Sequence, residues 1–168
     1  MNEEKLIQRD RMRFVKNTMC ANLCYLAILF DIFYFVLLYR SDVGTYYYTI
    51  QIGASIVYNL LFLLIVFLSS EEVKNYNKTY SYILLAVGVM QIVRIFVIPM
   101  DAHAATILVQ NMETGAMEET AVMGNSQFFW SVIHLAVSAA CLIVSAVVNI
   151  IRCSTLEAHN KYLESQKA

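Results

Sequence analysis

The chain has 168 residues, of which 59% are hydrophobic and only 15% are charged, and this composition excludes an ordinary soluble domain. Four membrane spans of about 20 apolar residues each would use roughly half of the sequence and leave no room in it for a second folded domain. The 12 Lys and Arg residues nearly balance the 13 Asp and Glu residues, so the net charge gives no reason to expect a nucleic-acid partner.

The first 18 residues predict a basic amphipathic tail. Leu6, Ile7, Phe14 and Val15 interrupt a run of basic residues at spacings that suit a short helix lying along the inner leaflet. We therefore expect residues 1–18 to lie in the cytoplasm and to anchor the chain to the membrane surface.

Four long apolar runs predict four transmembrane helices. They cover residues 19–39, 46–68, 80–99 and 128–151, and each is long enough to cross a bilayer. Aromatic residues gather at the ends of these runs, as is typical of the membrane interface. The connections at 40–45 and 69–79 are short, so successive helices should be antiparallel neighbours. The predicted fold is a single all-α domain, an antiparallel bundle of four transmembrane helices.

The longest connection, residues 100–127, is predicted to lie outside the membrane and to contain a small β-hairpin. Two β-favouring runs, 106–109 and 120–123, flank a turn-like sequence at 113–115. An isolated hairpin is marginal in water, so it would rest on the helix ends or on another protein. A loop without regular structure is the alternative. Asp101 and His103 in this connection are interpreted as solvated residues rather than as a metal site.

The distribution of Lys and Arg predicts the orientation of the chain. Ten of the 12 lie before the first span, in the second connection or after the fourth span, whereas the opposite side carries only Arg40 and a span contains Arg94. The positive-inside rule therefore places both termini in the cytoplasm of a chain that crosses the plasma membrane. Residues 152–168 form a second cytoplasmic tail, either a solvated helix end or a contact surface for a partner.

Polar residues recur at steps of three or four inside the predicted spans, a spacing that a helix places on one face. Because hydrocarbon disfavours polar groups, each such face should turn toward the interior of the bundle. The fourth span has the longest stripe, and the second span contributes to the same interior. The residues predicted to line it are Ser131, Ser138, Ser145, Asn149 and Asn59.

A polar cluster is predicted in the outer half of the bundle. At a rise of about 1.5 Å per residue, Asp31, Gln51, Arg94 and His134 fall at a similar depth, and Gln91 precedes Arg94 by one turn. Asp31 and Arg94 are the only acidic and basic side chains deep within the spans, so we expect an ion pair joined by His134. Two interpretations are left open: a structural lock, or an externally open site for an anionic or zwitterionic ligand or for protons.

The sequence lacks the residues that most membrane enzymes need. The four cysteines lie near the predicted cytoplasmic face or within the membrane, so we expect neither structural disulfides nor a disulfide-exchange site on the outer face. Cys20, Cys24 and Cys153 could bind a metal together, but apolar packing is the preferred interpretation. No phosphate-binding glycine loop, zinc-peptidase motif or nucleophile elbow is present. We expect no enzyme activity, metal or cofactor.

The predicted function follows from the small size of the bundle. Four helices can close around packed side chains, whereas enclosing a solute pathway generally requires more wall. We therefore expect a non-catalytic membrane protein that works by association, either as a homo-oligomer or as a subunit of a larger assembly. Its partners would be the lipid bilayer and itself or another membrane protein. The alternative is a small oligomeric transporter, channel or ligand sensor that uses Asp31, Arg94 and His134.

Overall fold

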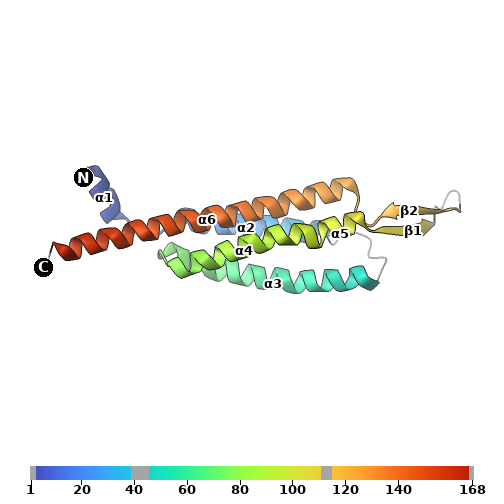
Figure 1. The fold of residues 1–168 in the computed structure, drawn as a ribbon, viewed down its shortest axis with the longest axis horizontal. Coiled ribbons are helices and arrows are strands. Elements are labelled where there is room, and N and C mark those ends of the chain that lie inside the picture. Colours follow the sequence, from blue (N-terminus) through green and yellow to red (C-terminus); the bar gives the residue numbers. More distant parts are fainter. Residues whose placement is uncertain (1–2, 39–45, 111–114, 167–168) are drawn as a thin grey trace.

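The computed structural model describes residues 3–38, 46–110 and 115–166, and four long helices dominate it (Figure 1). The elements in chain order are α1 (Glu3–Arg11), α2 (Thr18–Leu38), α3 (Tyr46–Lys74), α4 (Lys78–Val97), α5 (Pro99–Ala104), β1 (Thr106–Gln110), β2 (Met117–Ala121) and α6 (Asn125–Ser165). Helices α2, α3, α4 and α6 are long and apolar enough to cross a membrane. The predictions of a helical chain with four such helices and of a small hairpin are confirmed.

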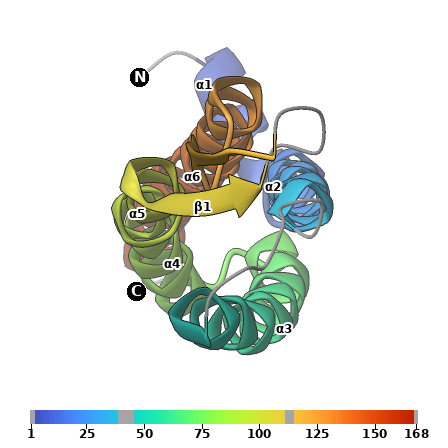
Figure 2. The same ribbon diagram turned by 90° about the vertical axis from the view of Figure 1, so that its right-hand side faces the viewer.

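The long helices form an elongated antiparallel bundle with two different ends. Both chain termini lie at one end, here called the terminal end, and the β1–β2 hairpin projects from the other, here called the hairpin end (Figure 1). Viewed from the hairpin end, α6 lies between α2 and α4, and α3 lies on the opposite side of the bundle (Figure 2). Helix α6 makes the most extensive contacts with α2 and α4, whereas α3 and α4 pack less extensively. The bundle is therefore a tight three-helix layer to which α3 is added.

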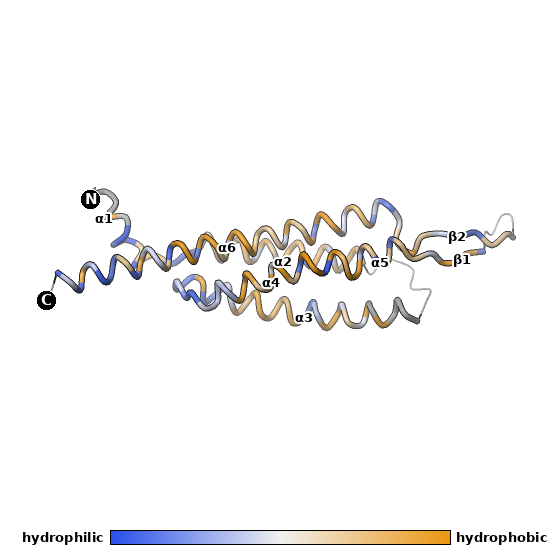
Figure 3. The backbone as a smooth tube through the Cα atoms, viewed as in Figure 1, coloured by the Kyte–Doolittle hydropathy of each residue, from blue (hydrophilic) through white to orange (hydrophobic). Residues whose placement is uncertain are grey.

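Helices α3 and α6 extend beyond the predicted spans at the terminal end. Helix α6 has 41 residues, which at about 1.5 Å per residue is roughly twice the thickness of a bilayer core. Its last turns are hydrophilic, whereas its first two thirds are largely apolar (Figure 3). Helix α1 packs beside this extension, where Asp10 Oδ1 lies 3.7 Å from His159 Nε2. The predicted amphipathic tail thus has a protein contact as well as exposed apolar side chains at Ile7 and Phe14.

The helix ends have recognisable local causes. Tyr76 adopts a positive φ of 59° after α3, and Asn77 then caps α4 by accepting a hydrogen bond from the Thr79 backbone N–H at 3.1 Å. At the other end of α4, Pro99 occupies the first turn of α5, where its missing N–H costs nothing. The short helix α5 is not predicted from the sequence, because Pro99 marks the end of the third apolar run and only a hairpin is expected after it.

Small residues allow the tight packing of α4 on α6. Gly88 in α4 is buried, and a Cβ at this position would lie 2.9 Å from Ile143 Cγ1 and 3.4 Å from Leu142 Cβ. Cys20, Cys24 and Ala27 of α2 are likewise fully buried in the core. The close approach of these helices therefore depends on side chains with little or no volume.

The hairpin pairs β1 with β2 in antiparallel register, Thr106 opposite Ala121 and Gln110 opposite Met117. The first strand matches the predicted run, but the second occupies 117–121 rather than 120–123. Val122 and Met123 leave the sheet because their backbone N–H groups bond to carbonyl oxygens in the α5 region, and both side chains are buried there. Of the predicted turn, residues 113 and 114 lie outside the described residues, and Gly115 has a φ of 70°.

Candidate functional site

A buried arginine joins three helices in the half of the bundle nearer the hairpin end. Arg94 of α4 donates from Nη1 to Asp31 Oδ1 of α2 at 3.0 Å and from Nη2 to Ser55 Oγ of α3 at 2.7 Å. The guanidinium carbon also lies 4.5 Å from the ring centroid of Tyr34 and 4.6 Å from that of Tyr58, within cation–π range. The side chains of Arg94 and Asp31 are only 5% and 1% exposed.

Gln91 extends this group through a hydrogen bond, and Asn59 lines a crevice together with Asp31. We name these residues the Arg94 cluster: Asp31, Tyr34, Ser55, Tyr58, Asn59, Gln91 and Arg94. Gln91 Nε2 donates to the same Asp31 oxygen at 2.9 Å. In the described part of the chain, hydrogen-bond partners are lacking for Asp31 Oδ2, Gln91 Oε1, Arg94 Nε and both polar atoms of the Asn59 amide, all of them buried. The cluster is thus a charge-neutral pair with unused donors and acceptors around it.

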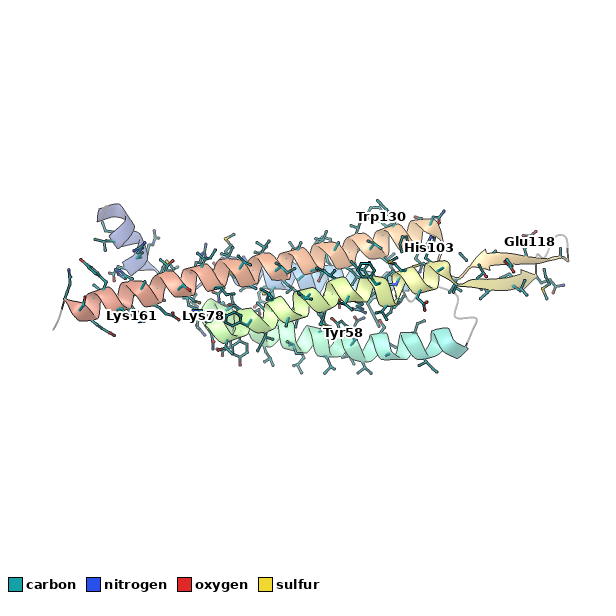
Figure 4. All side chains as sticks on the ribbon, in the orientation of Figure 1. Tyr58, Lys78, His103, Glu118, Trp130 and Lys161 are labelled. Atoms are coloured by element: carbon teal, nitrogen blue, oxygen red, sulfur yellow. The ribbon has the colours of Figure 1, made fainter. Side chains whose placement is uncertain are left out.

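Two crevices flank the cluster, one on each side of α3. The crevice between α2 and α3 has a volume of about 80 Å³ and is lined by Asp31, Ile32, Phe35, Ile56, Asn59, Leu60 and Leu63. The crevice between α3 and α4 has a volume of about 240 Å³ and includes Ser55, Tyr58 and Arg94 in its lining. Tyr58 extends from α3 toward α4 in the side-chain view (Figure 4). The Arg94 cluster therefore lies beside α3, the least tightly packed helix of the bundle.

Arg94 and Asp31 make the cluster a strong link between helices. A charge in the hydrocarbon region is costly unless it is paired, and each partner here removes that cost for the other. Since Ser55 and Tyr58 also hold the guanidinium, the same arginine attaches α3 to α2 and α4. The arrangement can lock three helices together and can also present the unused polar atoms to a ligand.

His134 does not join Asp31 and Arg94. Its Nδ1 donates to the Trp130 carbonyl oxygen at 2.6 Å, and its ring lies among aromatic rings of the outer surface, 5.7 Å from Phe30 and 5.9 Å from Phe33 between centroids. Trp130, in the same group, lies on the outside of α6 (Figure 4). The side chain of Gln51 lies outside the described residues. The structure thus brings together Asp31, Gln91 and Arg94, and it adds Ser55, Tyr34 and Tyr58.

The predicted polar stripe on α6 faces α2 rather than the Arg94 cluster. Two of its residues donate to backbone carbonyl oxygens of α2, Ser138 to Ala27 at 3.0 Å and Ser145 to Cys20 at 2.9 Å, and Gln127 adds a third bond to Leu37 at 2.7 Å. Residue numbers rise along α6 as they fall along α2, as an antiparallel pair requires. We name this row of bonds the α2–α6 ladder. Ser131 is buried with no hydrogen-bond partner for its hydroxyl among the described residues.

A second polar network ties the helices at the terminal end. Asn149 of α6 accepts from Asn17 Nδ2 at 2.7 Å and donates to Ser81 Oγ of α4 at 2.7 Å. Arg152 donates to the side-chain oxygen of Asn17, whose backbone N–H bonds to the Lys74 carbonyl at the end of α3. The spacing of polar residues predicts Asn149 as an interior residue but gives no signal for Asn17, which precedes the apolar run.

The cysteines are free thiols that pack in the helical core. Cys20, Cys24 and Cys153 are buried, and Cys153 Sγ lies 2.9 Å from the Tyr76 carbonyl oxygen. Cys24 Sγ and Ser145 Oγ are 3.4 Å apart beside the α2–α6 ladder. Within the described ranges, no three or more His, Cys, Asp and Glu residues are grouped so that they could hold a metal ion.

The chain was compared with protein families, with curated proteins and with solved structures, and none of the three comparisons finds a match.

Proposed function

We propose that this protein is a non-catalytic membrane subunit that works by binding another protein through its β1–β2 hairpin. The observation that carries the proposal is the isolation of the hairpin, which projects from the bundle without a helix along either face (Figure 1). A two-stranded hairpin alone is marginal in water and leaves a row of unpaired backbone groups on each outer edge.

The side chains of the hairpin support a binding role. Leu108 is 66% exposed, Met117 is 67% exposed and Val109 is 45% exposed. In the observed register Leu108 and Met117 lie diagonally opposite on one face of the sheet, and Val109 lies on the other face. Apolar side chains at the tip of a projecting hairpin are suited to insertion into a partner surface.

Charge favours a different protein over a second copy of this chain. Residues 100–127 contain four acidic residues and neither Lys nor Arg. Glu119 is paired with Leu108 across the hairpin and Glu118 with Val109, so each face presents a carboxylate beside an apolar side chain. Two copies meeting through these faces would bring like charges together, which is unfavourable. The expected partner therefore presents Lys or Arg beside apolar side chains.

The test uses photocrosslinking in membranes of the native host. A benzoylphenylalanine residue replaces Leu108 or Met117, and a control chain carries it at Lys161, at the opposite end of the molecule (Figure 4). We expect both hairpin positions to give one common heteromeric adduct whose contact peptide contains Lys or Arg. The control position should not give it. Reversing the charges with Glu118→Lys and Glu119→Lys should lower the adduct yield about tenfold, as expected for the loss of charge-assisted contacts worth about 1.4 kcal/mol in total.

Two results would contradict the proposal. An adduct between two copies of this chain would show that the hairpin is a homo-oligomer contact. The absence of any discrete adduct from either hairpin position, in a chain that reaches the membrane in normal amount, would show that the hairpin has no partner.

A further inference from the structure

We infer that the crevice between α2 and α3 is a binding site for an uncharged lipid-like molecule with a hydroxyl head, which enters from the bilayer. The site is separate from the hairpin, so the inference does not depend on the proposed function. It is argued from the unused polar atoms of the Arg94 cluster and from the walls of the crevice.

The polar end of the crevice has the donors and acceptors that a hydroxyl requires. Asp31 and Asn59 both line it, and their side chains are only 1% and 4% exposed. Asp31 Oδ2 can accept a hydrogen bond, the Asn59 amide can donate and accept, and within the described residues none of these atoms has a partner. These atoms are buried and have almost no surface open to the crevice, so side chains at its mouth must shift before a hydroxyl group can donate to the carboxylate and accept from the amide. Leaving buried polar atoms unpaired is costly, so an occupant that pairs both is stabilised.

The rest of the crevice suits an alkyl chain. Its other lining residues are apolar: Ile32 and Phe35 on α2, and Ile56, Leu60 and Leu63 on α3. Ile32 is 42% exposed and Leu60 is 63% exposed on the outer surface of the bundle, so the mouth of the crevice faces the side where lipid would lie. The volume of about 80 Å³ accommodates the hydroxyl head and the first carbon atoms but not a phosphate-bearing head with its attached groups, so most of the alkyl chain would lie outside the crevice along Ile32 and Leu60.

Charge excludes most other headgroups. Asp31 is already paired with Arg94, so the polar end is neutral overall. An anionic or cationic head would enter a low-dielectric site without a counter-charge of its own, which is unfavourable. A fatty acid or an alkylamine should therefore bind less well than the alcohol of the same chain length.

The experiment uses the purified full chain in nanodiscs and a dodecanol that carries a diazirine in the middle of its chain. After photolysis, mass spectrometry maps the labelled residues. We expect concentrated labelling at Ile32, Phe35, Leu60 or Leu63, which excess unlabelled 1-dodecanol competes away. Dodecane and dodecanoate should each be at least about tenfold weaker competitors, which corresponds to the loss of one hydrogen bond or the burial of one unpaired charge.

Two variants test the site by different means. Asn59→Leu replaces the polar amide by an apolar side chain of the same branching, and Leu63→Phe fills the crevice with a larger side chain. Both should lower the competable labelling about tenfold or more, whereas Ser131→Ala should leave it unchanged. Ser131 is the matched control because its hydroxyl is also buried without a partner among the described residues, but it lies on α6 and does not line the crevice.

The inference would be overturned by labelling spread evenly over the outer surface and insensitive to dodecanol, which is the result expected if only water fills the crevice. Equal competition by dodecane or by dodecanoate would also overturn it, because either would show that the hydroxyl is not recognised. Retention of full labelling in both Asn59→Leu and Leu63→Phe would assign the adduct to another site.

Discussion

The Asp31–Arg94 pair offers the most direct test of how this bundle is held together. Asp31→Asn and Arg94→Gln each remove one charge and leave the other buried. We expect each single change to lower the free energy of unfolding by about 3–5 kcal/mol, the range found when one member of a buried ion pair is deleted. The double change removes the unpaired charge and should cost no more than either single change.

The coupling energy can be bounded from the structure. With an effective dielectric constant of about 20, unit charges 3.0 Å apart attract by about 5.5 kcal/mol, which is an upper limit because dehydration of both groups offsets part of it. Hydrogen bonds between membrane helices average about 0.6 kcal/mol, which is a lower limit. We therefore expect a coupling of about 3–5 kcal/mol between Asp31 and Arg94, since this bond is charged and Gln91 and Ser55 support it.

Native cysteines provide the assay. Cys20 and Cys24 are fully buried, so their reaction with a thiol-sensitive dye reports unfolding as a denaturing detergent is added. The cycle is measured on the wild-type chain, the two single variants and the double variant. A second cycle pairs Asp31→Asn with Asn149→Leu, which belongs to the separate network at the terminal end. Those two changes should be additive within about 0.5 kcal/mol.

Additivity between Asp31→Asn and Arg94→Gln would refute the reasoning. It would mean that neither residue is held by the other and that the Arg94 cluster does not link α2 to α4. The reasoning would also be refuted if the double variant lost more free energy of unfolding than the two single variants lose in sum. The cost would then come from lost packing rather than from an unpaired charge.

Two further predictions follow from the packing and from the charge distribution. Gly88→Ala should lower the free energy of unfolding by about 1–3 kcal/mol, because the new Cβ would lie 2.9 Å from Ile143 Cγ1. Gly53→Ala is the control: a Cβ there has nothing within 4 Å, so the change should be neutral or slightly stabilising. Equal effects of the two changes in the thiol assay would contradict the close approach of α4 and α6. An impermeant thiol reagent should label the Met117→Cys variant in intact cells and the Lys161→Cys variant only after permeabilisation. Labelling of the wild-type chain, which has only its native cysteines, is subtracted as background. The reverse pattern would contradict the cytoplasmic termini expected from the positive-inside rule.

The sequence predicted the bundle well because hydropathy and span length determine which segments can cross a membrane. It also predicted that Asp31 and Arg94 meet, because two opposite charges inside apolar spans have few other ways to be stabilised. The ends of the helices were harder. Helix α6 continues to Ser165 because nothing in its polar extension breaks a helix; the sequence indicates that the helix continues past the span, but hydropathy does not show where it stops.

His134 shows where spacing alone fails. Each residue advances about 100° around a helix, so His134 lies about 60° from the direction of Ser131. Ser138 and Ser145 stay closer to that direction and are buried, whereas His134 falls at the edge of the stripe, next to Phe30. The stripe alternates steps of four and three, but this alternation produces two neighbouring lines: the serines lie on the buried one, whereas His134 and Cys141 lie on the other and are only partly buried. The ring partners of Arg94 were missed for another reason: Tyr34 and Tyr58 are as typical of packing as of cation binding.

The α2–α6 ladder has a consequence for the biogenesis of the protein. It joins the first of the four long helices to the last, and residues 39–124 must be synthesised between them. If α2 is a membrane span, it therefore enters the bilayer well before the helix that covers its small-residue face exists. Until α6 leaves the ribosome, Cys20 and Ala27 face lipid that cannot interlock with them as closely as a serine-lined helix does. Completion of the last helix, rather than insertion of any earlier one, is the step that commits the chain to its final form.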